Sequence, residues 1–279
     1  MALPEPVLHP VPTGAAQRPV ARVRSGKVRR YLDHVAEEVP VAFVINEAPF
    51  AVMMATPADL EDFAFGFMLS EGIVGDAGDV ELLGSEPLIE GIEIRLRIPV
   101  RYADALDRRR RSLSGRSGCG VCGSELLEAA LRRPGPVGEG IAVTTAALRR
   151  ALRGLHALQG LARLTGATHA AAWADGNGQV RLVREDVGRH NALDKLIGAM
   201  SRAGEDPQAG FAVVTSRASY EMAMKAASAG IALLAAVSAP TVLAISLAEA
   251  CNLTLVGFAR EDGYAVYTHP RRMSMESTA

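Results

Sequence analysis

The chain has 279 residues, of which 49% are hydrophobic, and its formal net charge at neutral pH is −1. A prior of roughly 150 residues per domain predicts about two domains, with enough apolar residues for a core that needs no disulfides. The near-zero net charge argues against a nucleic-acid partner. No apolar stretch reaches the roughly 18 residues that span a membrane without Gly, Pro or charge, so no membrane partner is expected.

Residues 1–30 are rich in Pro and Arg and show no hydrophobic periodicity. A secretory signal needs an uninterrupted apolar segment of about 7 to 15 residues, which this stretch lacks. We therefore expect residues 1–30 to be a mostly disordered tail. The three cysteines leave one unpaired by count, which fits a reducing compartment better than a disulfide framework, so a cytoplasmic location is expected.

Residues 31–105 predict a small α+β domain. The stretch VAFVINEAPFAVMMAT (41–56) is typical of two strands around a central turn. A helix should follow, with Thr56 and Asp59 in a capping-box pattern and Gly72 at its end. The stretches DVELLGS and GIEIRLRIP then predict two more strands.

Residues 106–140 interrupt this regular pattern. An arginine run (108–111) is followed by a Gly/Ser-rich stretch, SGRSGCGVCGSE, that contains Cys119 and Cys122. A helix is expected to begin at Ser124 and to end before PGPVGEG. We predict a basic, glycine-rich loop carrying a CxxC motif, followed by a linker helix.

Residues 141–272 predict an α/β domain, and 273–279 a short tail. Leucines at spacings of three and four predict one amphipathic helix over 144–164, and DGNG joins two strands of a hairpin. The following segments are a helix at 191–204, a strand at 211–216, a helix at 218–230, a strand at 231–238, a helix at 241–252 and a strand at 253–260. Strands that alternate with helices favour a mixed sheet, partly parallel, covered by helices. The order α-β-β-α-β-α-β-α-β resembles the cytidine-deaminase-like fold.

The zinc chemistry of deaminases is nevertheless not expected. Those enzymes place H-x-E at the start of the helix after the hairpin and P-C-x-x-C at the start of the next helix. Here the two places read HNA (190–192) and SRASY (216–220), without the glutamate or the cysteines. The CxxC that exists lies upstream of the domain. We therefore expect no metal site and no zinc.

Four interpretations of the CxxC remain open from the residues alone. A structural zinc site needs four ligands, but there is one pair, and Cys251 lies at the apolar end of a helix. A thioredoxin-like redox pair would follow a packed strand rather than a glycine-rich loop. The cysteines could also be incidental to an ordinary loop. As a sulfur carrier, the loop would need a reactive thiolate, which nearby arginines and a helix N-terminus favour.

Five longer stretches resemble one known family. They are TPADLEDFAFGFMLSEGI, GCGVCG, EDVGRHNALDKLIG, TSRASYEMAMKAASAGI and LVGFAREDGYAVYTHP. Over about residues 20–272 the chain resembles the formate dehydrogenase accessory sulfurtransferase family, FdhD/NarQ. The resemblance implies a sulfurtransferase that takes sulfur from a cysteine desulfurase as a cysteine persulfide. It would deliver this sulfur to the bis-molybdopterin guanine dinucleotide molybdenum cofactor that formate dehydrogenase needs. The alternative is a chaperone that binds the cofactor without covalent chemistry.

The resemblance also implies site residues. Cys119 would carry the persulfide, and Cys122 is the second catalytic candidate, either essential or needed only to help release the sulfur. The cofactor-binding segment falls on Phe258, Ala259, Arg260, Glu261, Asp262 and Gly263. The negative charge of Glu261 and Asp262 disfavours contact of these two side chains with phosphate.

The residues themselves add candidates at the predicted strand ends. Ligands of open α/β sheets bind beyond the carboxyl ends of strands, where helix N-termini offer N–H groups to phosphate. By this rule, further candidate cofactor-binding residues are Ser216, Arg217, Ser238 and His190. Cys251 is expected to be structural, and a homodimer formed through an apolar surface is a further expectation.

Overall fold

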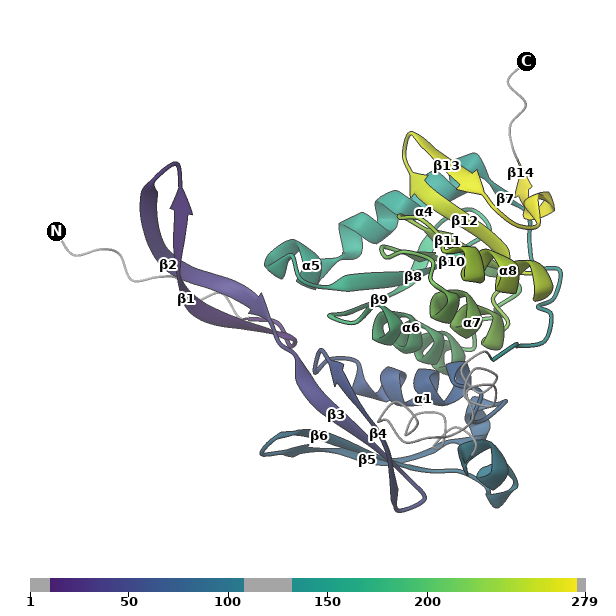
Figure 1. Ribbon diagram of the computed structural model, residues 1–279, viewed down its shortest axis with the longest axis horizontal. Helices are drawn as coiled ribbons and strands as arrows, with labels where there is room; N and C mark the ends of the chain where they lie inside the picture. The colour runs from purple at the N-terminus through teal and green to yellow at the C-terminus, as the bar shows by residue number, and fades with distance from the viewer. Residues whose placement is uncertain (1–10, 108–131, 275–279) are drawn as a thin grey trace.

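The computed structural model describes residues 11–107 and 132–274. The predicted CxxC loop with Cys119 and Cys122, most of the predicted linker helix and the end of the tail lie outside the described residues. The described chain consists of an N-terminal hairpin, a small α+β unit and a larger α/β unit (Figure 1). Within these ranges, no helix is long and apolar enough to cross a membrane.

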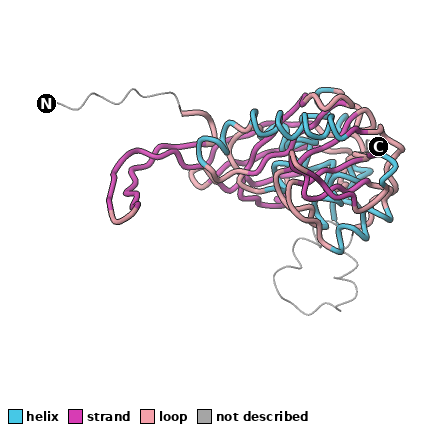
Figure 2. The backbone as a smooth tube through the Cα atoms, turned by 90° about the horizontal axis from the view of Figure 1, so that it is seen from above, coloured by secondary structure: helices cyan, strands magenta, loops and turns pink. Residues whose placement is uncertain are grey.

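The N-terminal hairpin pairs β1 (Ala15–Arg24) with β2 (Lys27–Ala36) and projects from the body of the molecule (Figures 1 and 2). Its turn residues Ser25 and Gly26 have φ angles of 48° and 75°. This left-handed backbone is the one that two-residue hairpin loops require. The expectation that residues 1–30 are mostly disordered is therefore wrong for these strands. Both faces of the hairpin are largely exposed, so its sequence lacks the alternation of a half-buried strand.

The small unit is a sheet in the order β4-β3-β6-β5 with a helix packed on one face. Its elements are β3 (Val39–Ile45), β4 (Ala48–Ala55), α1 (Leu60–Ser70), β5 (Glu81–Leu88) and β6 (Gly91–Arg97), with short 3-10 turns at Ala77–Asp79 and Val100–Tyr102. Phe43 of the sheet stacks on Phe67 of the helix with ring centroids 4.4 Å apart. The predicted strands and helix of this region are confirmed.

The predicted capping box of α1 is wrong. The helix begins at Leu60, and Asp59 before it has a left-handed backbone with φ 52°. Thr56 is engaged elsewhere, because its hydroxyl accepts a hydrogen bond from the backbone N–H of Val187 at 3.1 Å and its own N–H donates to Asp186 at 3.0 Å. The residue therefore joins the two units instead of capping the helix.

The larger unit is a mixed sheet in the order β13-β12-β11-β10-β8-β9. Its elements are β7 (Val143–Thr144), α4 (Thr145–Leu158), α5 (Gly160–Thr165), β8 (His169–Asp175), β9 (Val180–Asp186), α6 (Arg189–Ala203), β10 (Gly210–Val214), α7 (Tyr220–Ser228), β11 (Leu233–Ala236), α8 (Val242–Ala250), β12 (Thr254–Arg260), β13 (Gly263–Val266), a 3-10 turn at Pro270–Arg272 and β14 (Met273–Ser274). Strands β10, β11 and β12 are parallel, and the other neighbours in this sheet are antiparallel. Helices α6, α7 and α8 cover one face and α4 covers the other (Figure 1). The predicted mixed, helix-covered sheet is confirmed.

The single helix predicted over residues 144–164 is divided in two. Gln159 has non-helical backbone angles and separates α4 from α5. The carboxylate of Glu185 accepts hydrogen bonds from the N–H groups of Leu161 and Ala162 at 2.9 and 2.7 Å, which caps the start of α5. Leu158 is consequently 55% exposed instead of buried on the helix stripe. The break between α4 and α5 therefore depends on Glu185 of β9, a residue that is distant in sequence.

The two units meet where α1 crosses α6. A Cβ atom added to Gly66 would lie 1.6 Å from the carbonyl oxygen of Asp194, and one added to Gly198 would lie 1.9 Å from that of Asp62. The backbones of the two helices are therefore in direct contact, which glycine alone permits. Buried ion pairs lie beside this crossing, including Lys225 with Asp194 at 2.8 Å.

Candidate functional site at the strand ends

Four strand ends and three helix starts meet at one edge of the larger sheet. Strands β10, β11 and β12 are parallel, and β9 runs in the same direction because two antiparallel steps separate it from β10. Helices α6, α7 and α8 follow β9, β10 and β11, so all three begin at this edge. Such an edge is where open α/β sheets bind ligands, and helix N-termini favour anions.

Backbone hydrogen bonds fix the loops at this edge relative to one another. The N–H of Ala218, after β10, donates to the carbonyl of Ala239, after β11, at 3.2 Å, and the N–H of Thr241 donates back to Ala218 at 3.1 Å. The N–H of Phe258 donates to the carbonyl of Ser238 at 3.1 Å. The segments SRAS (216–219) and SAPT (238–241) thus run side by side, and a ligand here would meet a preformed surface.

The predicted residues in these two loops differ in how accessible their side chains are to a ligand. Ser216 is buried, and its hydroxyl donates to the carbonyl of Arg217 at 3.0 Å. Arg217 is exposed, and Ser238 is half-buried. Thr241 caps α8 by accepting from the N–H of Ala244 at 3.3 Å. Ser219, in the corresponding place before α7, has a buried hydroxyl oxygen for which the described residues provide no hydrogen-bond partner.

The segment from Phe258 to Gly263 forms the end of β12 and its turn into β13. Phe258 has φ 51° at an irregularity in the strand pairing, and its side chain is 45% exposed. A bulky residue in the left-handed region is strained, and such strain concentrates at binding and catalytic sites. Ala259 is fully buried, so it could offer a ligand its backbone only. Arg260, Glu261 and Asp262 are exposed on the turn.

His190 lies in the first turn of α6 and faces an acid from α7. Its Nε2 atom is 2.8 Å from the Glu221 carboxylate. His169, at the start of β8, lies nearby: burial lowers the pKa of His169, and the charges of Arg189 and His190 lower it further while Asp186 opposes them. Sequence reasoning missed His169 and Glu221, because each follows the ordinary pattern of its strand or helix.

Two neighbours of His190 hold the fold together. Asp186 is fully buried and accepts hydrogen bonds from Lys195 at 2.7 Å, from Asn191 at 3.0 Å and from the N–H groups of Thr56 and Gly188 at 3.0 and 2.7 Å. Asn191 also donates to the carbonyl of Met54 at 2.8 Å. These groups are engaged within the protein, so a ligand at this edge would meet His190 but not them.

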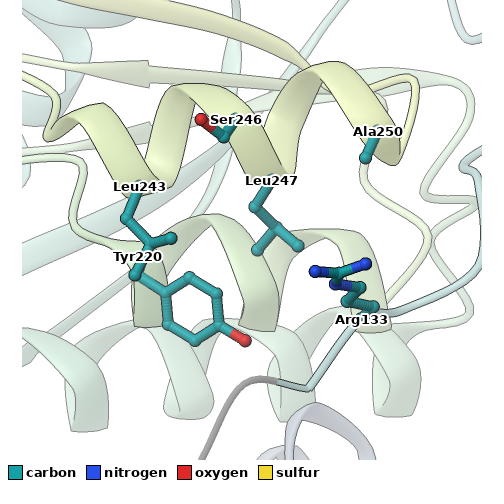
Figure 3. Close-up of a pocket in the computed structure, with 6 residues that line it drawn as sticks. All are labelled: Arg133, Tyr220, Leu243, Ser246, Leu247 and Ala250. Atoms are coloured by element: carbon teal, nitrogen blue, oxygen red, sulfur yellow. The ribbon is translucent and has the colours of Figure 1, made fainter. Parts of the chain in front are cut away.

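A separate groove of about 280 Å³ lies between α7 and α8 (Figure 3). It is lined by Arg133, Tyr220, Leu243, Ser246, Leu247 and Ala250. The Tyr220 hydroxyl donates to the carbonyl of Arg132. This bond connects the start of α7 to the first residue of the second described range, 132–274. The lining is mostly apolar, unlike that of a phosphate site, and as far as the described residues go it includes none of the predicted site residues.

Cys251 is the one cysteine among the described residues. It is 1% exposed, its sulfur lies 3.2 Å from the carbonyl oxygen of Pro134, and burial raises the pKa of its thiol. The low exposure of the side chain and the raised pKa of the thiol both disfavour the thiolate, which is the reactive form. Within residues 11–107 and 132–274, no group of three or more His, Cys, Asp and Glu side chains could hold a metal ion.

Cys251→Ala is expected to leave the sulfur transfer that the family resemblance implies within a few-fold of the parent. The buried thiol packs as a small apolar group, so its removal changes packing but no reactive centre. A thiol reagent should modify Cys251 rapidly only after unfolding, which peptide mass spectrometry of labelled native and denatured protein measures. Rapid labelling of Cys251 in the native protein would contradict the structural role.

Comparisons with known proteins agree on one family. The model of the FdhD/NarQ family matches residues 36–274. The sulfur carrier protein FdhD of Xanthomonas euvesicatoria pv. vesicatoria (strain 85-10) is 59% identical over 270 residues, which covers 97% of this chain and 96% of the relative. The protein of the same name from Cupriavidus necator is 51% identical over 279 residues, with 98% and 97% covered.

One solved structure is similar along almost the whole chain. It is a crystal structure assigned to a formate dehydrogenase accessory protein from Desulfotalea psychrophila, with a TM-score of 0.75 and 23% identity. The match covers 94% of this chain and 100% of that chain. At this identity the likeness establishes the fold and nothing further.

Proposed function

The chain belongs to the FdhD/NarQ family, and from this we propose that it is a sulfurtransferase that carries sulfur as a persulfide on Cys119. The sulfur would come from a cysteine desulfurase and go to the bis-molybdopterin guanine dinucleotide molybdenum cofactor of formate dehydrogenase. The observation that carries this proposal is the identity of 51% to 59% with sulfur carrier proteins over nearly the full length. A cytoplasmic location is part of the proposal, because free thiols persist in a reducing compartment.

The loading step needs no external oxidant or reductant. The Cys119 thiolate would attack the terminal sulfur of the desulfurase persulfide, forming a new S–S bond. The S–S bond within the donor would break, and its electron pair would leave on the desulfurase cysteine as a thiolate. The arginines that precede Cys119 in the sequence (108–111 and 116) would favour the attacking thiolate electrostatically.

The cofactor is cargo in this proposal, and the strand-end edge is the proposed place where it binds. Phosphate groups would lie against the N-terminus of α7, where the Ser219 hydroxyl lacks a partner within the described residues. Arg217 is exposed in the loop before α7, and Arg260 is exposed at the end of β12, at the same edge of the sheet. The Phe258 ring, which is exposed and stands on a strained backbone, would stack on a guanine or pterin ring. His190 and Ser238 would supply polar side-chain contacts at the same edge, whereas Ser216, whose hydroxyl is buried and bonded to the carbonyl of Arg217, would contribute through its backbone.

The architecture supports a related proposal. Apart from the short helix α5, the succession α4-β8-β9-α6-β10-α7-β11-α8-β12 resembles the element order of the cytidine-deaminase-like fold. We propose that the larger unit shares this arrangement and uses the equivalent helix starts for a nucleotide-containing cargo instead of zinc chemistry.

Mass spectrometry after treatment with cysteine desulfurase and cysteine tests the sulfur-carrying role. The proposal expects the chain to gain one sulfur, located on Cys119 in peptide spectra and removed by a thiol reductant. A chain that gains no sulfur but still binds the cofactor would be the non-covalent chaperone instead.

Arg260→Ala is expected to weaken GDP binding about tenfold or more. A charge-assisted hydrogen bond contributes about 1.5–3 kcal/mol, and 1.4 kcal/mol is a factor of ten in affinity. Calorimetric titration of parent and variant with GDP measures the change. Arg271→Ala is the matched control, since Arg271 is an exposed arginine that bonds to Glu139 and Asn252 near the opposite end of β12. Equal affinity of parent and Arg260→Ala would remove Arg260 from the site.

A further inference from the structure

The end of the N-terminal hairpin concentrates positive charge. Residues 15–36 contain six Lys or Arg and one Asp, a net charge of +5, whereas the whole chain carries −1. Five of these six cations lie within residues 21–32, the stretch that joins the end of β1 to the start of β2. Every residue of this stretch is exposed. We call residues 21–32 the basic tip.

Apolar side chains are exposed among these charges. Val23 pairs directly with Val28 in the register of the hairpin, so both lie on one face next to the turn. Their exposed fractions are 64% and 61%, and Leu32 on the same face is 49% exposed. Arg30 also lies on this face, between the two valines and Leu32. The basic tip therefore mixes cations with apolar groups instead of separating them on two faces.

The cations of the basic tip repel one another. A hollow of about 780 Å³ is lined by Arg22, Arg24, Lys27, Arg29 and Arg30, among others. The register places Arg24 opposite Lys27 and Arg22 opposite Arg29, and like charges directly opposite each other destabilise a strand pair. Within residues 11–107 and 132–274, Asp33 is the one acid that forms an ion pair with any of these cations, with Arg22 at 3.8 Å. An anionic partner would relieve this repulsion.

The basic tip extends well beyond the body of the molecule. Figure 2 shows the end of the hairpin far from the helices and sheets of the two units. A two-stranded ribbon is at best marginally stable alone in water. Since the body does not reach the tip, the anionic partner is another molecule.

The combination of charge and apolar exposure favours one class of partner. A nucleic acid offers phosphates to the cations, but it leaves Val23, Val28 and Leu32 without an apolar environment. An anionic lipid surface offers both, because its headgroups carry phosphate and its acyl chains begin directly below them. Cations on both faces of the ribbon reach headgroups together when the turn enters such a surface.

We propose that the basic tip is a peripheral membrane anchor that binds anionic phospholipid headgroups. Val23 and Val28 enter the headgroup region, and the surrounding Arg and Lys side chains bind phosphate oxygens. This contact differs from the membrane-spanning one that the apolar stretches of the sequence argue against. It weakens with salt, because exposed charges are screened beyond about 10 Å at 0.1 M ionic strength. The inference does not depend on the proposed sulfur transfer.

Co-sedimentation of the full chain with vesicles tests the anchor. One set of vesicles contains equal parts of phosphatidylglycerol and phosphatidylcholine, and the other contains phosphatidylcholine alone. The parent is expected to bind the anionic vesicles about tenfold or more tightly than the neutral ones, and less tightly as salt is raised. Arg24→Glu/Arg29→Glu should weaken binding to anionic vesicles about tenfold or more. Val23→Ser/Val28→Ser should weaken it severalfold, since two apolar side chains no longer enter the headgroup region.

A matched charge variant separates the basic tip from net charge. Arg149→Glu/Arg153→Glu reverses two exposed arginines of α4, the same change in net charge as in Arg24→Glu/Arg29→Glu, and should bind like the parent. Circular dichroism checks that every variant is folded. A parent that does not bind anionic vesicles at low salt, equal weakening in the two charge variants, or unchanged binding of Val23→Ser/Val28→Ser would each overturn the proposal. Binding of the parent to single-stranded RNA or duplex DNA but not to vesicles would also overturn it and assign the basic tip to nucleic acid.

Discussion

Cys119→Ala is expected to abolish sulfur transfer while the fold and GDP binding stay unchanged. Alanine has no sulfur atom to form the persulfide, and no neighbouring group can replace a thiolate nucleophile. Reconstitution of formate dehydrogenase activity from its sulfur-free form, with desulfurase and cysteine present, measures transfer. Melting temperature and GDP titration are the controls for folding and for the strand-end site.

The second cysteine of the motif provides the comparison. Cys122→Ala should retain part of the activity if Cys122 assists only in the release of sulfur from Cys119. Complete and equal loss in both variants would favour a disulfide or a shared-sulfur mechanism. Full activity of Cys119→Ala would exclude Cys119 as the persulfide carrier.

Lys225→Met is expected to lower the free energy of unfolding by about 3–5 kcal/mol, because it removes the cation that pairs with the fully buried carboxylate of Asp194. The Lys225 ammonium donates to Asp194 at 2.8 Å, to Glu71 at 2.7 Å and to Ser70 at 3.0 Å, between α7, α6 and the end of α1. Although burial opposes the charge, the carboxylates Asp194 and Glu71 raise the pKa of Lys225. Urea unfolding of parent and variant measures the loss.

Two further variants separate the charge effect from packing. In Lys225→Met/Asp194→Leu both buried charges are gone, while Glu71 keeps Arg132 at 3.6 Å, so much of the stability should return. Arg95→Met is the exposed counterpart: Arg95 is paired with Glu93 at 2.6 Å on the surface, where solvent screens the ion pair, so its loss should leave the free energy of unfolding nearly unchanged. Equal losses in Lys225→Met and Arg95→Met would contradict the role given to burial.

The pH dependence of Lys225→Met follows from the same groups. Burial raises the pKa of Asp194, and removal of the lysine should raise it further. Some carboxyl groups have a higher pKa in the folded protein than in the unfolded chain. Such a group stabilises the fold fully when the pH lies below its unfolded pKa, and this stabilisation is lost as the pH rises through its folded pKa. The deficit of Lys225→Met relative to the parent should therefore shrink toward about pH 4.

The sequence alone located most elements of the larger sheet. Apolar runs such as FAVVTS and IALLAAVS are continuous because these strands are buried on both faces, and each is followed by a helix pattern. Parallel strands end at one edge, so the same pattern indicated that residues such as Ser216, Ser238 and Arg260 would gather there. The predicted positions of these strands and helices are confirmed, because the hydrophobic pattern records which face of an element is buried.

The tertiary structure alone decided what depends on contacts between distant segments. Glu185 divides a helix that its own leucine pattern predicts as continuous, and Asp186 takes Thr56 from a predicted cap. The sequence by itself suggests an exposed helix residue at Lys225, whereas in the structure Lys225 forms ion pairs with Asp194 and Glu71. The hairpin was not predicted because both of its faces are largely exposed, so its sequence does not carry the pattern of a half-buried strand. Local periodicity reports burial within one element, whereas ion pairs and caps from distant residues depend on the arrangement of several elements in space.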